Sequence, residues 1–439
     1  MPALIGHWRA RLRSGDRSAL LLAILAAALV LRIVVVVATP HFVPATDAAE
    51  YDQAAVSLAR HGSFAPSVAT FHGGPTAYHP PLFSIVLAAV YKVVGTGSEH
   101  VRWTSGRLLE ALLGTLTVWL VALIAFRIWP GRRVGLTAAA IAAIYPPLML
   151  VGSSLLSESL FIPLVLAAVW AALVYRDDRR LRWAVLAGVL VGLSALTRGN
   201  GFLLVIPVGF LVCTGRRRRS WGAPLAVLLA AVVVLIPWTV RNYNVFHTFV
   251  PVTTETGYAI AGTYNAQVQH QSRNPALWSA PFAGTATILR SDPTANEQQI
   301  SSRLETMGLD YIRAHPSSLL KTVFWNTVRM VWPSPGLERY LAPYEGYPAR
   351  LAQLSAYGFW LLLVLAVIGA AVPLTRRAPW ALWMCPLLVY LTTVGLEGTT
   401  RYRSPADPFL ILPAAVGVLA LVDRARAWRH DRVALGVPA

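Results

Sequence analysis

Three carboxylates within six positions follow the first long apolar run of the chain: Asp47, Glu50 and Asp52. Glu50 and Asp52 are interpreted as solvated or helix-capping acids. Asp47 is different because Glu158 and Arg198 stand at the ends of later apolar runs, where ionisable residues are costly and mark functional sites. Desolvation by surrounding helices would raise the pKa of such a carboxylate, which suits a general base. Asp47 and Glu158 are therefore the candidate catalytic residues.

Basic side chains at the ends of apolar runs predict an anion site. One interfacial arginine usually contacts a lipid headgroup, but here four arginines end apolar runs: Arg198, Arg241, Arg401 and Arg403. Guanidinium groups bind phosphate oxygens through paired hydrogen bonds. His79 precedes two prolines that would begin a helix, and a helix N-terminus favours an anion. These five side chains are predicted to bind a phosphate.

The elements that position these residues are predicted to be membrane helices. Hydrophobic residues make up 56% of the chain and charged residues only 13%, with a mean hydropathy of +0.54. The net charge of +18 comes mainly from arginines between apolar runs, where they act as topology signals and partners of lipid phosphates. We therefore expect an integral membrane protein and no nucleic-acid partner. Cys213 and Cys385 lie inside apolar runs, so no disulfide framework is expected.

The apolar runs predict an all-α polytopic fold with about ten transmembrane helices. The first run begins near residue 20 and is long enough to be an uncleaved spanning helix. The others fall at about 105–126, 134–152, 159–175, 183–198, 201–214, 222–240, 353–373, 379–395 and 408–422. Residues 80–95 are short and begin with two prolines, and we predict that they form a re-entrant or interfacial helix. The dense arginine clusters, such as 9–17 and 216–219, then all face the cytoplasm.

This topology divides the chain into a cytoplasmic N-terminus, an N-terminal transmembrane module with a catalytic first outer loop at 39–104, an extracytoplasmic loop region, C-terminal transmembrane helices and a cytoplasmic tail. Their predicted bounds are 1–19, 20–240, 241–352, 353–422 and 423–439. In the first outer loop, the spacing of Tyr51, Ala55 and Leu58 predicts an amphipathic interfacial helix that ends near Gly62. In the second loop, Thr294-x-x-Glu297 predicts a capping box. The candidate site then lies outside the cytoplasm.

The order of several short motifs resembles a known superfamily. The pattern D-x-x-x-Y, A-x-x-G-x-F and H-P-P-L in the first outer loop is followed by "SLLSESLF", "LTRG", "PWTVRN", "YIRAHP" and "RYRSPADPFL". This order resembles the GT-C superfamily, in particular its bacterial branch of aminoarabinose (lipid A) transferases and protein mannosyltransferases. The resemblance implies inverting transfer of a hexosyl or pentosyl unit from a polyprenyl-phosphate donor. The acceptor would be a lipid, a cell-envelope glycan or a protein outside the bacterial cytoplasmic (inner) membrane.

The resemblance also implies roles for individual residues. An acid at the start of the first outer loop is the base or orients the acceptor in such enzymes, and it corresponds to Asp47. The acid that begins a later helix corresponds to Glu158, and the cation before the two prolines corresponds to His79. Three further side chains are expected to bind sugar or acceptor: Tyr51, Tyr78 and Asn242.

The sequence departs from its relatives around Asp47. Ala48 stands where relatives frequently have a second acid, and Glu50 replaces a basic residue. Because of these departures, the sequence predicts no cofactor with certainty. A divalent metal bound by Asp47, Glu50 or Asp52 remains an alternative. No GxxxxGK[ST] motif is present, and no nucleotide cofactor is expected.

The main alternative is a transporter or flippase of a lipid-linked sugar. It predicts charges near the middle of the bilayer and helices interrupted at corresponding positions of two halves. Arg32 is the one basic residue deep in a predicted span, and no internal repeat of 20–50 residues is visible. A different extracytoplasmic transferase, such as a polymerase or ligase of lipid-linked glycans, is the other possibility.

Overall fold

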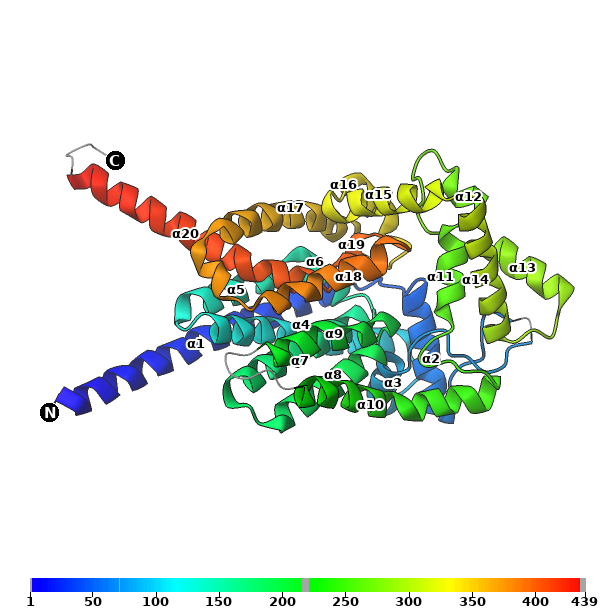
Figure 1. The fold of residues 1–439 in the computed structure, drawn as a ribbon, viewed down its shortest axis with the longest axis horizontal. Coiled ribbons are helices and arrows are strands. Elements are labelled where there is room, and N and C mark those ends of the chain that lie inside the picture. The colour runs from blue at the N-terminus through cyan, green and yellow to red at the C-terminus, as the bar shows by residue number, and fades with distance from the viewer. Residues whose placement is uncertain (1, 71, 215–220, 435–439) are drawn as a thin grey trace.

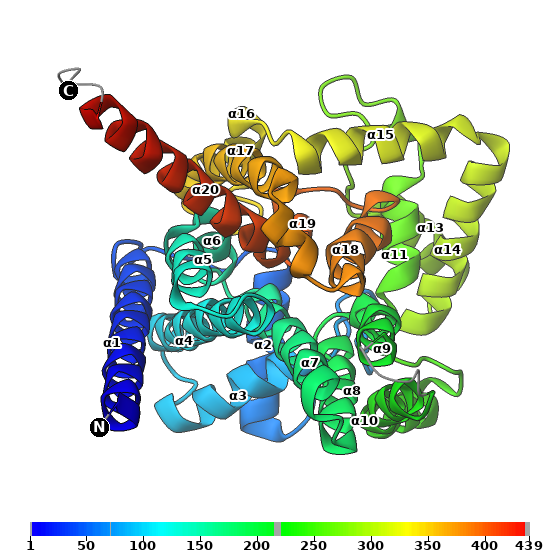
Figure 2. The same ribbon diagram turned by 60° about the vertical axis from the view of Figure 1, so that its left-hand side comes forward.

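The computed structural model describes residues 2–70, 72–214 and 221–434, with side chains from Ser18 to His430 within those ranges. Every regular element in this part of the chain is a helix (Figures 1 and 2), which confirms the predicted all-α fold. The arginine clusters at 9–17 and 216–219, on which part of the predicted topology rests, lie outside the described side chains.

Among the described residues, six helices are long and apolar enough to cross a membrane: α1 (Pro2–Val37, from Ser18), α4 (Glu99–Ile128), α7 (Glu158–Asp178), α10 (Gly222–Phe246), α17 (Ala349–Ala371) and α20 (Asp407–Ala434, to His430). Shorter apolar helices lie at the other predicted runs: α8 (Leu181–Ala195), η1 (Gly199–Leu204) with α9 (Val205–Cys213), and η3 (Trp380–Trp383) with α18 (Met384–Val394). The chain is therefore a multi-pass membrane protein, while the count of about ten spans stays a prediction.

The predicted run at 134–152 is broken into α5 (Arg132–Ile144) and α6 (Pro146–Val151). The last carbonyls of a helix have no partner within it, and buried Arg32 of α1 supplies one by donating to Ala142 O at 3.3 Å and Ala143 O at 3.1 Å. Gly114 makes room, because a Cβ there would lie 2.6 Å from Arg32 Nε. Arg32, which lies deep in a predicted span, is thus a helix cap.

Both ends of the described chain lie at the same end of the molecule, opposite α11 (Glu255–Thr263), α13 (Phe282–Ser291) and α14 (Glu297–Ala314) (Figure 1). Termini on one side require an even number of crossings, as the predicted topology does. Residues 80–95 contain α3 (Leu82–Val94), whose 13 residues rise only about 20 Å against the roughly 30 Å of a bilayer core. Helix α8, a predicted span, has 15 residues, so the statement that α3 does not cross stays a prediction.

The two outer loops are mostly helical. The first contains α2 (Asp47–His61), which ends at Gly62 with φ 70°, as predicted. The second contains, besides α11, α13 and α14, the helices α12 (Ala266–Gln269), α15 (Ser317–Val331) and α16 (Pro335–Leu341). Helix α19 (Thr400–Arg403) lies between α18 and α20, and η2 (Pro373–Arg377) follows α17.

The predicted capping box in the second loop is wrong. Helix α14 is capped by Asn296 and Gln299 rather than by Thr294 and Glu297, because the Asn296 side chain accepts from Gln299 N and the Gln299 side chain accepts from Asn296 N. Glu297 is instead buried and accepts hydrogen bonds from the first outer loop. Helix α10 continues to Phe246 without a break at 240, so that Arg241 and Asn242 lie within a helix.

Candidate active site

The candidate site is organised around Arg401 of α19, whose side chain is 4% exposed. Its Nε donates to Glu158 Oε1 at 2.7 Å, its Nη1 to Glu345 Oε2 at 2.8 Å and its Nη2 to Asp47 Oδ2 at 2.6 Å. Asp47 begins α2, Glu158 begins α7, and Glu345 follows α16. One guanidinium therefore joins three carboxylates from distant parts of the sequence.

A second arginine completes the cluster. Arg198, which precedes η1, donates from Nη1 to Glu158 Oε1 at 2.5 Å, and Glu158 is fully buried. Both guanidinium groups lie over the ring of Tyr402, at 5.1 Å for Arg198 and 5.4 Å for Arg401. The structure thus brings together four of the predicted site residues: Asp47, Glu158, Arg198 and Arg401.

The predicted rise in the pKa of Asp47 is wrong. Burial raises this pKa, but the charge and hydrogen bond of Arg401 and the charges of His79 and Arg198 outweigh burial and lower it to about 2. The carboxylate is consequently ionised at any physiological pH. Its Oδ2 is bound to Arg401, while Oδ1 makes no hydrogen bond within the described part of the chain.

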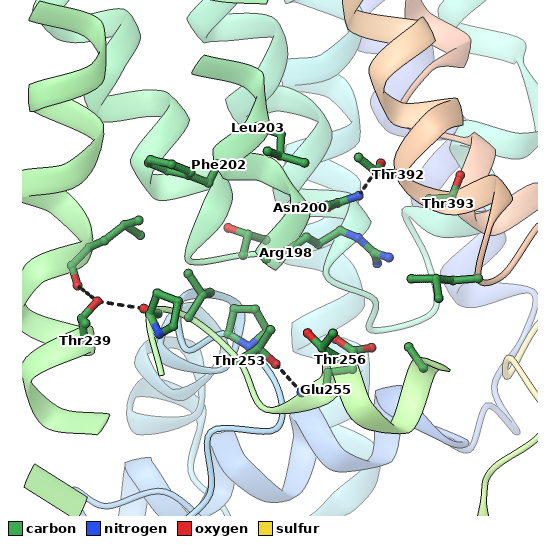
Figure 3. Close-up of a pocket in the computed structure, with 18 of the residues that line it drawn as sticks. Arg198, Asn200, Phe202, Leu203, Thr239, Thr253, Glu255, Thr256, Thr392 and Thr393 are labelled. Carbon is green, nitrogen blue, oxygen red and sulfur yellow. Dashed lines mark hydrogen bonds between the residues drawn. The ribbon is translucent and has the colours of Figure 1, made fainter. Parts of the chain in front are cut away.

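Asp47 and Arg198 open into a cavity of about 920 Å³. Figure 3 shows the guanidinium of Arg198 pointing into it, with Asn200 and Thr392 to one side and Glu255 and Thr256 to the other. The Asn200 side-chain amide donates to Thr392 Oγ1 at 3.2 Å. One flank of the cavity is apolar and comes mainly from α10 and η1: Phe202, Leu203, Val232, Leu235, Ile236 and Val240. A polar end and an apolar flank thus share one space.

Three acids of this site were missed by the sequence analysis: Glu255, Glu345 and Glu397. Burial raises the pKa of all three carboxyl groups, and that of Glu397 reaches about 8. Glu255 and Glu397 line the cavity, and Glu345 binds Arg401. Glu397 follows an apolar run four positions before Arg401, the same signal that singled out Glu158. Glu255 and Glu345 lie in the long second loop, where no periodicity marks them.

His79 lies beside the cluster and is paired with an acid. Its Nε2 is 2.9 Å from Glu50 Oε2. Burial lowers the pKa of His79, but Glu50 and Asp47 outweigh burial and raise it to about 9. Its ring packs against both predicted tyrosines, with ring centroids 4.5 Å from Tyr51 and 4.8 Å from Tyr78. Glu50 is therefore the partner of a cation and not simply a solvated acid.

One backbone N–H of the helix N-terminus that was predicted to help His79 bind phosphate already has a partner. The backbone N–H of Leu82, the first residue of α3, donates to Leu196 O at 2.8 Å. Tyr51 and the neighbouring Pro80 line the cavity, whereas His79 and Tyr78 stand behind them. His79 thus contacts Glu50 and is not part of the cavity lining, and its binding of phosphate stays a prediction.

Three other predicted site residues lie away from the cluster. Arg403 pairs with Asp407 at 3.0 Å and donates to Met330 O at 2.7 Å, both in buried contacts. Arg241 donates to Thr76 O at 2.8 Å. Asn242 is fully buried and donates to Val250 O at 3.1 Å. Phosphate binding by Arg403 and sugar binding by Asn242 stay predictions, and Arg241 ties α10 to the first outer loop.

The three candidate metal ligands do not form one site. Asp52 faces away from Asp47, where it accepts from Tyr91 Oη at 2.8 Å and pairs with Arg102 at 3.2 Å. Glu50 pairs with His79. Within the described residues, no three His, Cys, Asp or Glu side chains gather as a metal site requires. The position between the site carboxylates is filled by the guanidinium of Arg401, so this donor set fits the arginine and not a metal.

Comparison with known proteins supports the fold. Residues 78–241 match the family of dolichyl-phosphate-mannose-protein mannosyltransferases. The structure is similar to the oligosaccharyltransferase AglB from Archaeoglobus fulgidus in complex with an inhibitory peptide and a dolichol-phosphate, with a TM-score of 0.58 and 14% identity. That likeness covers 95% of this chain and 52% of the archaeal one, so the chain spans about half the length of AglB.

A weaker likeness is found to ArnT from Cupriavidus metallidurans bound to undecaprenyl phosphate, with a TM-score of 0.41, 16% identity, and coverage of 90% of this chain and 76% of that one. No curated protein matches by sequence. The resemblance predicted from the motifs is confirmed: the chain is an integral membrane protein with the fold of the GT-C superfamily of glycosyltransferases.

Proposed function

We propose that the protein is an inverting glycosyltransferase that moves one monosaccharide from a polyprenyl-phosphate donor to an acceptor on the extracytoplasmic side of a bacterial cytoplasmic membrane. The observation that carries this proposal is the cavity that joins Asp47 and Arg198 to an apolar flank on α10 and η1. A lipid-linked sugar has the same two parts, a charged head and a long apolar tail.

The apolar flank suits the tail because it continues onto surfaces that face lipid. Leu203, Val232, Ile236 and Val240 all line the cavity and remain between 39% and 51% exposed. In a bilayer these side chains contact acyl chains, so a polyprenyl tail passes from the membrane into the cavity without leaving an apolar environment.

The polar end suits the phosphate and the sugar. Arg198 uses one Nη1 for Glu158 and presents the rest of its guanidinium to the cavity (Figure 3). The Asn200 amide lies beside it. These N–H groups bind the phosphate, and the neutral carboxyl of Glu397 donates a hydrogen bond to a phosphate or sugar oxygen.

Asp47 then holds the acceptor hydroxyl through its free Oδ1 and receives its proton. The acceptor oxygen attacks the anomeric carbon from the face opposite the phosphate, which forms the new glycosidic bond. The bond from the anomeric carbon to the phosphate oxygen breaks, and the electron pair leaves with polyprenyl phosphate. With a pKa near 2, Asp47 is a weak base, so positioning contributes more than basicity, up to about 7–11 kcal/mol in well-oriented reactions.

The test is turnover by purified protein with a panel of polyprenyl-phosphate monosaccharides, measured together with donor binding. Asp47→Asn should bind the active donor normally and lose transfer, because the amide accepts no proton. Asp310→Asn is the matched control, since Asp310 is exposed and pairs only with Arg313 three residues away. Donor binding without transfer by the wild type, or full transfer by Asp47→Asn, would contradict the proposal and favour a lipid-sugar flippase.

A further inference from the structure

A buried pair on α4, Arg107 and Glu110, contacts both chain segments that lead to the candidate acids. Arg107 is 2% exposed and Glu110 is fully buried. Neither side chain lines the cavity. We infer that Arg107 and Glu110 are positioning residues that fix Asp47 and Glu158 relative to each other. This inference rests on the proposed function.

Glu110 holds the short connection that precedes Glu158. Its two carboxylate oxygens accept from consecutive backbone amides, Leu155 N and Leu156 N, both at 2.8 Å. Leu155 has a φ of 56°, a left-handed conformation that is unfavourable for a residue with a Cβ and persists only where its surroundings impose it. The two hydrogen bonds that the Glu110 side chain accepts hold this conformation, and Glu158 begins α7 three residues later.

Arg107 joins the same connection to the end of α1. Its Nε donates to Ser153 O at 2.7 Å, and its Nη1 donates to Thr39 O at 3.1 Å. A further hydrogen bond runs from Nη2 to Thr39 Oγ1, and the guanidinium lies 4.4 Å from the centre of the Phe42 ring. Residues 39–46 lead directly to Asp47. One side chain of α4 therefore touches the approach to each acid.

The surface of α4 is shaped for this contact. A Cβ on Gly106 would lie 2.6 Å from Leu155 Cδ2, so a larger residue at this position would require the Leu155 side chain to shift. Gly106, Arg107 and Glu110 lie within one turn of α4 and face the connection together. Because Asp47 and Glu158 bind different nitrogens of Arg401, a shift of either segment would move an acid relative to the cavity.

The first test is Glu110→Gln in the full-length protein. Glutamine keeps the shape and one acceptor, but its amide NH2 faces the second backbone N–H. We expect kcat to fall by about 100-fold, the effect of roughly 1 Å of misplacement. The donor Kd should change much less than kcat, because Asn200 and the apolar flank of the cavity bond to neither acid. Hydrogen exchange should rise at the amides of Leu155 and Leu156.

Arg107→Gln should likewise lower kcat far more than it changes the donor Kd. Because both residues act through one arrangement, the double variant should lose little more activity than either single variant. Arg32→Gln is the matched control: Arg32 is also a buried charge that donates to backbone carbonyls, but it caps α5 and holds neither acid. It should lower the stability of the fold and leave kcat per folded molecule unchanged.

Three outcomes would overturn the inference: wild-type kcat in Glu110→Gln and Arg107→Gln, an equal loss of kcat in Arg32→Gln, or unchanged hydrogen exchange at Leu155 and Leu156 in Glu110→Gln. The exchange measurement needs no substrate. A wild-type protein that binds donor without transferring sugar would instead contradict the proposed function, so the two failures are distinguishable.

Discussion

Replacing Arg401 by Gln should destabilise the fold. It should also change the pH below which kcat falls. Arg401 is 4% exposed and holds Asp47, Glu158 and Glu345 with three charged hydrogen bonds of 2.6–2.8 Å. Glutamine can donate only two and carries no charge. Removing one partner of a buried ion pair typically costs about 3–5 kcal/mol, and here three carboxylates lose the same partner.

The pH dependence provides the sharper part of this prediction. The folded pKa of Asp47 is lowered to about 2 from an ordinary 3.8. Such a group contributes stability above pH 3.8 that is lost as the pH falls through 2. Without Arg401, burial becomes the dominant influence and raises the pKa of Asp47. The acid limb of kcat due to Asp47 then moves upward in Arg401→Gln, whereas the wild type should show no such limb above pH 4.

Unfolding by denaturant in detergent, combined with kcat between pH 4 and 7, measures both effects. Arg401→Lys is the control because it keeps the charge but offers a compact ammonium in place of the planar fork. It should retain more stability than Arg401→Gln and most of the low pKa of Asp47. A glutamine variant as stable as the wild type, with an unchanged acid limb, would refute the assignment of Arg401 as the counter-charge.

Three further predictions follow from other buried groups. The pKa of His79 is raised from 6.5 to about 9. Its pairing therefore contributes about 3 kcal/mol to the free energy of unfolding below pH 6.5, at 1.36 kcal/mol per pKa unit, and this contribution is lost as the pH rises through 9. The free energy of unfolding of Glu50→Gln should lack this dependence on pH. Ionisation of Glu397 above pH 8 places a negative charge in the cavity, so the donor KM should rise there in the wild type and stay flat in Glu397→Gln. Glu297 accepts from Ser67, Thr76, Ala77 and Thr254; since hydroxyls can rotate to accept, Glu297→Gln should lower the free energy of unfolding by only about 1–3 kcal/mol, measured beside Asp310→Asn.

The sequence predicted the centre of the site because of where its residues stand along the chain. Asp47, Glu158, Arg198 and Arg401 each stand at the end of an apolar run on the same predicted side. The ends of membrane helices lie near one plane, so side chains from distant parts of the sequence are confined to a thin layer and have few places to go. The convergence of these four residues follows from that confinement.

The lateral order of the helices could not be predicted in the same way. Arg241 and Arg403 carry the same signal as Arg198, yet they lie elsewhere in that layer and bind Thr76 O and Asp407. The direction of the Asp47 pKa shift could not be predicted either. Burial raises this pKa and the charge of Arg401 lowers it, and which effect is larger depends on the distance between Arg401 and Asp47. The pattern of apolar and charged segments along a sequence predicts neither how the helices are arranged beside one another nor the distances between their side chains.

The proposed reaction also accounts for the surplus of acids around the cavity. The site has more carboxylates than cations: Asp47, Glu50, Glu158, Glu255, Glu345 and Glu397 face His79, Arg198 and Arg401. Raised pKa values reduce this surplus, and Glu397, with a pKa of about 8, carries a proton at neutral pH. During transfer the leaving phosphate changes from a diester to a monoester and gains negative charge. Asp47 loses its own charge in the same step by taking the acceptor proton. The net charge near Arg401 then stays constant, and its guanidinium is released from one carboxylate as the phosphate becomes more negative.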